Sequence, residues 1–142
     1  MERKAYQVVD DYRAHREDYR EHMDHAPRLF LIMRGLPESG KSAFAQEVAR
    51  YTDQVGLHTL ICSADNFFQR GGGYVFDRSR LHEAHETCYT QCREALERDL
   101  DRGVDIVIVD NTNLREHEFE RYLDLHILCL SPILAGWAVK SC

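Results

Sequence analysis

Short apolar runs alternate with longer amphipathic segments along this chain. The run "LFLIM" (29–33) is apolar at every position, which is typical of a strand buried on both faces of a parallel sheet. A glycine-containing loop follows, and then "SAFAQEVARY" (42–51) repeats its apolar positions with a helical period. The pattern therefore predicts a strand, a loop and a helix in immediate succession.

The alternation continues to the end of the chain. Apolar runs predict further strands at 58–63, 104–110 and 126–130, and the glycine-rich segment 71–76 predicts a flexible loop. Strands that alternate with helices favour right-handed crossovers and a parallel sheet covered on both faces. We therefore expect an α/β fold with three layers.

Two more helices and an N-terminal segment complete the predicted architecture. A long helix carries an apolar stripe that starts at Leu81, and Asp77 or Ser79 should cap its first turn. A short helix is expected at 115–123. The charged N-terminal segment has a loose apolar stripe, which fits either a helix packed on one side or an arm.

Composition limits the class of protein. The chain has 142 residues, 44% of them hydrophobic and 30% charged, and a formal net charge of −6. This charge argues against indiscriminate binding to nucleic-acid backbones, which needs Lys and Arg. Five cysteines form no disulfide framework, and no apolar run reaches the roughly 20 residues that span a membrane. We expect a cytoplasmic or nuclear protein without a membrane segment.

The loop after the first strand carries the strongest chemical signal. "GLPESGKS" (35–42) has the spacing G-x-x-x-x-G-K-[ST], in which backbone N–H groups surround phosphate oxygens. Lys41 should reach the terminal phosphates, and the hydroxyl of Ser42 should hold Mg²⁺. A chance match in a turn is the alternative, which the position between a buried strand and a helix disfavours. The predicted nucleotide-binding residues are Gly35, Leu36, Pro37, Glu38, Ser39, Gly40, Lys41, Ser42 and Ala43.

Acidic residues follow two of the other predicted strands. Asp110 comes directly after "IVIV" and is a candidate for the second acidic group at Mg²⁺, acting through water. Asp65, in "SADNFF" (63–68), can take a proton from an attacking hydroxyl. Each acid could instead cap the segment that follows it. Ligands of open parallel sheets bind at this carboxyl edge.

The long predicted helix also holds histidines and cysteines at spacings of three and four. His82, His85, Cys88 and Cys92 lie in "LHEAHETCYTQC" (81–92). One helix presents these side chains as a stripe, so zinc would need ligands from other elements. Solvated histidines and buried cysteines are the favoured interpretation.

Taken together, "RGLPESGKS", "ICSADNFF", "GYVFD", "LHEAH" and "VDNTNL" resemble the polynucleotide-kinase-like family of P-loop proteins. This group includes the kinase-like domain of NEDD-binding protein 2 and, more distantly, the phage polynucleotide 5′-kinase. The resemblance covers roughly residues 28–123. It implies a P-loop kinase-like fold and transfer of the ATP γ-phosphate to 5′-hydroxyl ends of nucleic acid.

The resemblance also assigns roles to single residues. Lys41 and Asp65 would be catalytic, with Asp65 as general base, and Ser42 and Asp110 would hold Mg²⁺. Asn113 and His85 match family positions near the substrate edge. The implied ligands are ATP and Mg²⁺.

Three departures from the family pattern stand out. Glu38 replaces a glycine of the loop, and Phe68 stands where the phage kinase has an arginine that helps hold the substrate. The apolar segment 124–142 does not look like the family's arginine-bearing lid, and no arginine follows Arg121. The sheet is therefore expected to be incomplete at its C-terminal end.

These observations divide the chain into a polar N-terminal helix or arm (1–27), a P-loop kinase-like core (28–123) and an atypical tail (124–142). An ATP-dependent kinase acting on 5′-hydroxyl ends is the leading interpretation. A catalytically impaired nucleotide-binding or partner-binding module without a lid is the second, and a small-metabolite kinase is the third.

Overall fold

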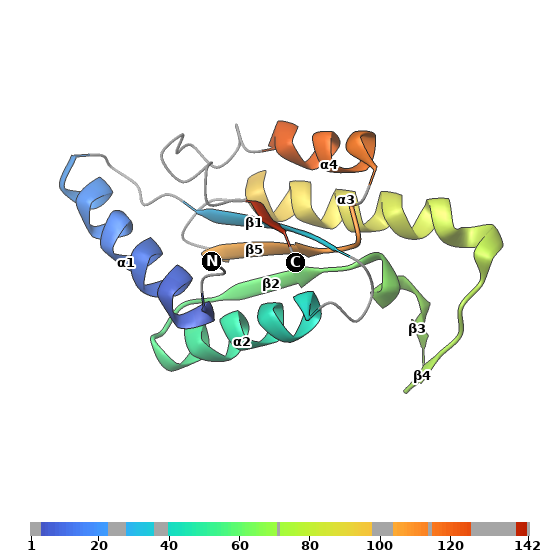
Figure 1. The fold of residues 1–142 in the computed structure, drawn as a ribbon, viewed down its shortest axis with the longest axis horizontal. Helices are drawn as coiled ribbons and strands as arrows, with labels where there is room; N and C mark the ends of the chain where they lie inside the picture. Colours follow the sequence, from blue (N-terminus) through green and yellow to red (C-terminus); the bar gives the residue numbers. More distant parts are fainter. Residues whose placement is uncertain are drawn as a thin grey trace.

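In the described part of the chain, the central sheet has four parallel strands (Figure 1). The computed structural model describes residues 4–22, 28–35, 40–70, 72–97, 104–113, 115–125 and 139–141. In spatial order the strands are β2 (Thr59–Cys62), β5 (Ile106–Asp110), β1 (Leu29–Arg34) and β6 (Val139–Ser141). Because the strands run parallel, the carboxyl ends of β2, β5 and β1 lie together at one edge of the sheet.

The two central strands are buried on both faces. In β1, Leu31 packs into the cluster on one face of the sheet, and its neighbour Ile32 packs into the cluster on the other. Ile108 and Val109 of β5 alternate in the same way. Successive side chains of a strand point to opposite faces, so the continuous apolar runs reflect two separate cores. This confirms the prediction made from "LFLIM".

Helices cover both faces of the sheet. Helices α1 (Ala5–His22) and α2 (Lys41–Gln54) pack on one face, while α3 (Leu81–Glu97) and α4 (Glu116–Leu123) pack on the other (Figure 1). Val9 and Tyr12 bury α1 against the first core. The predicted three-layer α/β fold with a parallel sheet is confirmed.

The long helix begins with a short 3₁₀ turn. Asp77 caps this turn (Arg78–Arg80), because its carboxylate accepts hydrogen bonds from the Ser79 backbone N–H at 3.0 Å and from the Ser79 hydroxyl at 2.7 Å. Asp77 is therefore the cap, and Ser79 is its hydrogen-bond donor. Leu81 begins the helix and fits the predicted apolar period, but its side chain is 38% exposed. The stripe becomes buried from Ala84 onward, first against Ala64 and Phe68 of the preceding 3₁₀ turn and then, from Cys88, against the sheet.

The glycine-rich segment is a hairpin in part, which corrects the predicted flexible loop at 71–76. Strand β3 (Gln69–Arg70) pairs antiparallel with β4 (Gly73–Tyr74). The hairpin follows a 3₁₀ turn (Ala64–Phe68) and projects from the carboxyl edge of the sheet (Figure 1). Backbone pairing across so few residues needs support from packing, and Phe68 supplies it.

Some predictions fall outside the described residues. They include the strand predicted at 126–130. Beyond 126–130, the segment Val139–Ser141 lies beside β1, with Ile32 opposite Val139. Among the described residues, no helix is long and apolar enough to cross a membrane.

Candidate functional site

The described ends of the phosphate loop lie between β1 and α2. The backbone N–H of Gly35 donates to the carbonyl of Thr112 at 2.9 Å, which ties the loop's start to the segment after β5. Gly40 has φ 96° and precedes the first turn of α2, where Ala43 is exposed. That backbone conformation strains any other residue. Leu36, Pro37, Glu38 and Ser39 lie outside the described residues, so their roles stay predictions.

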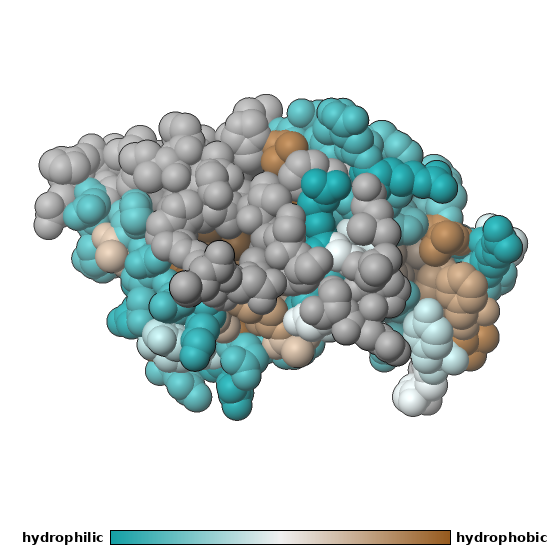
Figure 2. Space-filling model, in the orientation of Figure 1, coloured by the Kyte–Doolittle hydropathy of each residue, from teal (hydrophilic) through white to brown (hydrophobic). Residues whose placement is uncertain are grey.

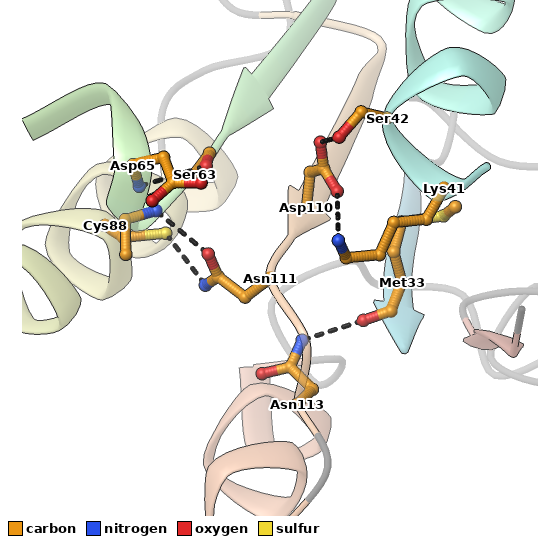
Figure 3. Close-up of polar contacts among 10 residues, drawn as sticks. Met33, Lys41, Ser42, Ser63, Asp65, Cys88, Asp110, Asn111 and Asn113 are labelled. Carbon is orange, nitrogen blue, oxygen red and sulfur yellow. Dashed lines mark hydrogen bonds and ion pairs between the residues drawn. The ribbon is translucent and has the colours of Figure 1, made fainter. Parts of the chain in front are cut away.

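Lys41 and Ser42 both converge on Asp110 at the end of β5 (Figure 3). The hydroxyl of Ser42 donates to Oδ2 of Asp110 at 2.7 Å, and Nζ of Lys41 lies 3.7 Å from Oδ1. The side chains of Lys41 and Asp110 are only 9% and 10% exposed. The structure therefore brings a nearly buried cation, a hydroxyl and a carboxylate to one point, although Asp110 is 68 residues from Ser42 in sequence.

This cluster has the chemistry that Mg²⁺ requires. Carboxylate and hydroxyl oxygens are the hard donors that Mg²⁺ prefers. Oδ1 of Asp110 is buried and receives no hydrogen bond from the described part of the chain. A buried carboxylate oxygen without a donor is costly unless a cation lies nearby. The oxygens of Ser42 and Asp110 therefore fit Mg²⁺ as ligands, and the ammonium of Lys41 lies beside them.

Asp65 lies at the same edge, after the neighbouring strand β2. The hydroxyl of Ser63 accepts from the backbone N–H of Asp65 at 3.2 Å and so starts the 3₁₀ turn that carries it. The phenol of Tyr74 donates to Oδ1 of Asp65 at 3.3 Å. Burial and then the charge of Asp65 raise the pKa of the Tyr74 phenol, so this group stays a donor. Asp65 itself is exposed and can meet a solute.

Asn111 links the two acidic positions, and the sequence did not single it out. Its Oδ1 accepts from the backbone N–H of Ala64 at 2.9 Å, and its Nδ2 donates to the sulfur of Cys88 at 3.5 Å (Figure 3). Asn111 is 7% exposed. Its amide therefore joins the end of β5 to the turn that carries Asp65. The run of four polar residues in "DNTN" could have pointed to Asn111, but the sequence does not show which way each side chain points.

Asn113 has a buried amide that supports the end of β1. Its side-chain Nδ2 donates to the carbonyl of Met33 at 2.8 Å, and its backbone carbonyl accepts from Nε of Arg34 at 2.9 Å. The residue is 1% exposed and has φ 49°, a left-handed conformation that asparagine tolerates better than most residues. The structure thus uses its side chain to hold β1, and the predicted contact with substrate stays a prediction.

His85 and Asn113 line one cleft of about 720 Å³ between α3 and α4. His82 and His117 also line it, together with the ion pair between Arg121 and Glu86. The structure thus brings the two predicted substrate-edge residues to the same hollow, next to the carboxyl edge of the sheet.

The Arg121–Glu86 pair closes one wall of this cleft. Two guanidinium nitrogens of Arg121 donate to the carboxylate at 2.9 and 3.3 Å, and the guanidinium lies 4.0 Å from the ring centroid of Tyr89. The hydrogen bonds from Arg121 lower the pKa of Glu86. Because the planar guanidinium is fixed by both partners, Arg121 acts as a wall rather than as a mobile cation.

Phe68, which replaces an arginine of the phage kinase, is a core residue. It is 2% exposed and packs with Ala64 and Ala84. An arginine with a free charge would be costly at such a buried position. The cysteines of α3 are also buried, as the sequence predicted for Cys88 and Cys92.

Comparison with known proteins places this geometry in context. Residues 30–132 match a family model described as an AAA domain. A stretch of 97 residues, 68% of this chain, is 36% identical to NEDD4-binding protein 2 of Homo sapiens and spans 5% of that protein's length. An APS kinase structure from Mycobacterium tuberculosis aligns with a TM-score of 0.52 and 18% identity, over 81% of this chain and 74% of that one. This structural likeness bears on the fold alone.

Proposed function

The chain belongs to the polynucleotide-kinase-like family of P-loop proteins, and we propose that it is an ATP-dependent 5′-hydroxyl kinase. The kinase-like, nucleotide-binding character follows from the family. The nucleic-acid 5′ end as acceptor is the proposed part.

The convergence of Lys41 and Ser42 on Asp110 is the observation that carries this proposal. In P-loop proteins the lysine reaches the β- and γ-phosphates, while the Ser hydroxyl and an acid after a strand hold Mg²⁺. Asp65 follows the neighbouring strand, and the Asn111–Ala64 hydrogen bond joins its turn to the end of β5. A donor site and a proton acceptor thus lie at one sheet edge.

The residues have separate tasks in the proposed reaction. Asp65 takes the proton of the acceptor hydroxyl, whose oxygen forms a bond to the γ-phosphorus while the bond to the ADP oxygen breaks. The Tyr74 hydroxyl donates to Oδ1 of Asp65, which leaves Oδ2 for the acceptor hydroxyl. Lys41 turns from Asp110 to the phosphates and balances the negative charge on them.

Mg²⁺, when held by Ser42 and Asp110, neutralises the charge of the phosphate oxygens. The bond between Ser42 and Asp110 already sets both oxygen ligands side by side at 2.7 Å. Mg²⁺ binding would therefore cost little additional conformational entropy in these two side chains. Asp110 thus has two roles, since it orients Ser42 and balances Lys41 until phosphate arrives.

A single-turnover assay tests the proposal. Excess protein is mixed with Mg²⁺, γ-labelled ATP and a 5′-hydroxyl oligonucleotide, and label in the oligonucleotide is followed over time. Lys41→Met and Asp65→Asn should each abolish most of the transfer. Lys4→Met and Asp53→Asn are matched controls, because both residues are exposed and lie outside the described cluster.

The outcomes separate the three interpretations. Transfer to the oligonucleotide that both active-site variants lose supports the proposal. ATP binding without transfer to any acceptor supports an impaired nucleotide-binding module and overturns the proposed activity. Transfer to mononucleosides or other small hydroxyl compounds, but not to oligonucleotides, overturns the acceptor class and supports a small-metabolite kinase.

A further inference from the structure

The hairpin beside Asp65 presents consecutive apolar side chains to solvent. Tyr74, Val75 and Phe76 are 52%, 67% and 51% exposed. Figure 2 shows apolar surface at the end of the molecule where β3 and β4 lie in Figure 1. Single exposed apolar residues need no explanation, but a contiguous group marks an interaction site.

These side chains are held in place from below. The buried ring of Phe68 lies 6.2 Å from the ring of Tyr74 and 5.0 Å from that of Phe76, in edge-on and tilted arrangements. The backbone N–H of Val75 donates to the carbonyl of Phe68 at 2.9 Å. Binding at such a supported surface costs less conformational entropy than binding at free side chains, because the rings of the protein are already ordered. The exposed rings form a prepared surface.

The surface is continuous with the candidate catalytic site. Tyr74 has its ring in the exposed group and its hydroxyl on Oδ1 of Asp65. A molecule with a hydroxyl at Asp65 therefore has its neighbouring atoms close to these rings.

We propose that Tyr74 and Phe76 form a stacking surface for the unpaired first base at the 5′ end of a single-stranded nucleic acid. The inference rests on the proposed function, which puts the 5′-hydroxyl at Asp65. Aromatic rings bind bases of any sequence by stacking. A chain with net charge −6 gains little from phosphate neutralisation, so stacking has to supply a large share of the affinity.

Kinetics with matched acceptors test the surface. Wild-type protein is given a 5′-hydroxyl oligonucleotide and the same oligonucleotide with an abasic first nucleotide. The base should lower KM for the acceptor roughly 5- to 150-fold, which is the range for one stacked base. Phe76→Ala should raise KM for the base-bearing acceptor and leave KM for ATP and for the abasic acceptor unchanged. Tyr6→Ala is the matched control, because Tyr6 is a 49% exposed aromatic residue on α1.

Tyr74 separates stacking from positioning. Tyr74→Phe keeps the ring and removes the bond to Asp65, so kcat should fall while KM for the acceptor stays the same. Tyr74→Leu removes the ring as well, and KM should then rise too. Far-UV circular dichroism and the melting temperature verify that each variant is folded. Equal effects of the two substitutions on KM would overturn the stacking role of this ring.

A binding measurement keeps the inference separate from the activity. An oligonucleotide with 2-aminopurine as its first base should lose fluorescence when it stacks, and Phe76→Ala should prevent this change. Quenching that depends on Phe76, without any phosphate transfer, supports the surface and overturns the proposed function. Transfer that is indifferent to both the abasic nucleotide and Phe76→Ala overturns the surface alone. Loss of self-association in Phe76→Ala, with transfer and quenching unchanged, identifies a protein contact and also overturns it.

Discussion

The ion pair between Lys41 and Asp110 should behave as a coupled unit in the absence of nucleotide. Asp110→Asn removes the carboxylate charge and leaves the buried Lys41 cation without the ion-pair partner that it has in the described part of the chain. Lys41→Met removes the cation, while Ser42 still donates to Asp110 at 2.7 Å. We therefore expect Asp110→Asn to be the more destabilising single change, and the double variant to be less destabilised than the sum.

The size of the coupling follows from distance and burial. At the observed 3.7 Å, two unit charges attract by about 1 kcal/mol in bulk water and about 4 kcal/mol at an effective dielectric constant of 20. Both side chains are about nine-tenths buried, so their attraction is closer to the value at the lower dielectric constant. The cost of desolvating both charges offsets part of this attraction. The expected coupling free energy is about 1–3 kcal/mol, within the range for residues in contact.

A double-mutant cycle measures this value. Urea unfolding, followed by far-UV circular dichroism, gives the free energy of unfolding for the wild type, both single variants and the double variant. The exposed pair Arg50–Glu47, at 3.1 Å with side chains 71% and 59% exposed, is the matched control. Its cycle with Arg50→Met and Glu47→Gln should give about 0.5 kcal/mol or less.

Nucleotide gives the cycle a second readout. Phosphates supply the counter-charge that Lys41 loses in Asp110→Asn, so ATP should restore part of the stability of that variant and less of Lys41→Met. A Lys41–Asp110 coupling no larger than that of the Arg50–Glu47 control would refute the reasoning, because the pair would then interact through water.

Three further predictions concern other residues. Asn111→Ala should lower the free energy of unfolding by about 1–3 kcal/mol in urea titrations, because it leaves a buried backbone N–H without its acceptor; a change below 0.5 kcal/mol, the usual range for surface substitutions, would contradict this role. Hydrogen bonds from Arg121 lower the pKa of Glu86, so their stabilisation is present above the ordinary glutamate pKa and is lost as pH falls through the lowered value. Melting temperatures between pH 6 and pH 3 should therefore fall more steeply for wild type than for Arg121→Gln, by a small amount because the pair is partly exposed, and parallel curves would rule this out. Glu38→Gly, a prediction from the sequence alone, should tighten Mg-ATP binding in calorimetry because it removes a charge from the phosphate loop; unchanged or weaker binding would mean that Glu38 faces away.

Local patterns in the sequence carried most of the fold. Continuous apolar runs identified the buried strands, because both faces of β1 and β5 meet a core. Helical periodicity identified α2 and α3, and the spacing of "GLPESGKS" placed the phosphate loop between strand and helix. These features depend on residues that are close in sequence, so they can be predicted from local sequence patterns.

Features that depend on distant partners could not be read in this way. The burial of Lys41 against Asp110 and the Asn111–Ala64 link follow from β5 lying between β2 and β1. Leu81 fits the periodic stripe but is exposed, because the first turn of α3 extends beyond the sheet. Periodicity reports which side of a helix is apolar, not how far the neighbouring layer reaches.

The sequence by itself determined the strand–loop–helix order, the residues of the phosphate loop and the two-faced burial of the central strands. Only the tertiary structure decided that Asp110 receives both Lys41 and Ser42. It also decided that the glycine-rich segment folds back on Phe68 and holds aromatic rings beside Asp65. The physical reason is that apolar patterning specifies what each segment buries, whereas strand order and close packing specify which side chains meet.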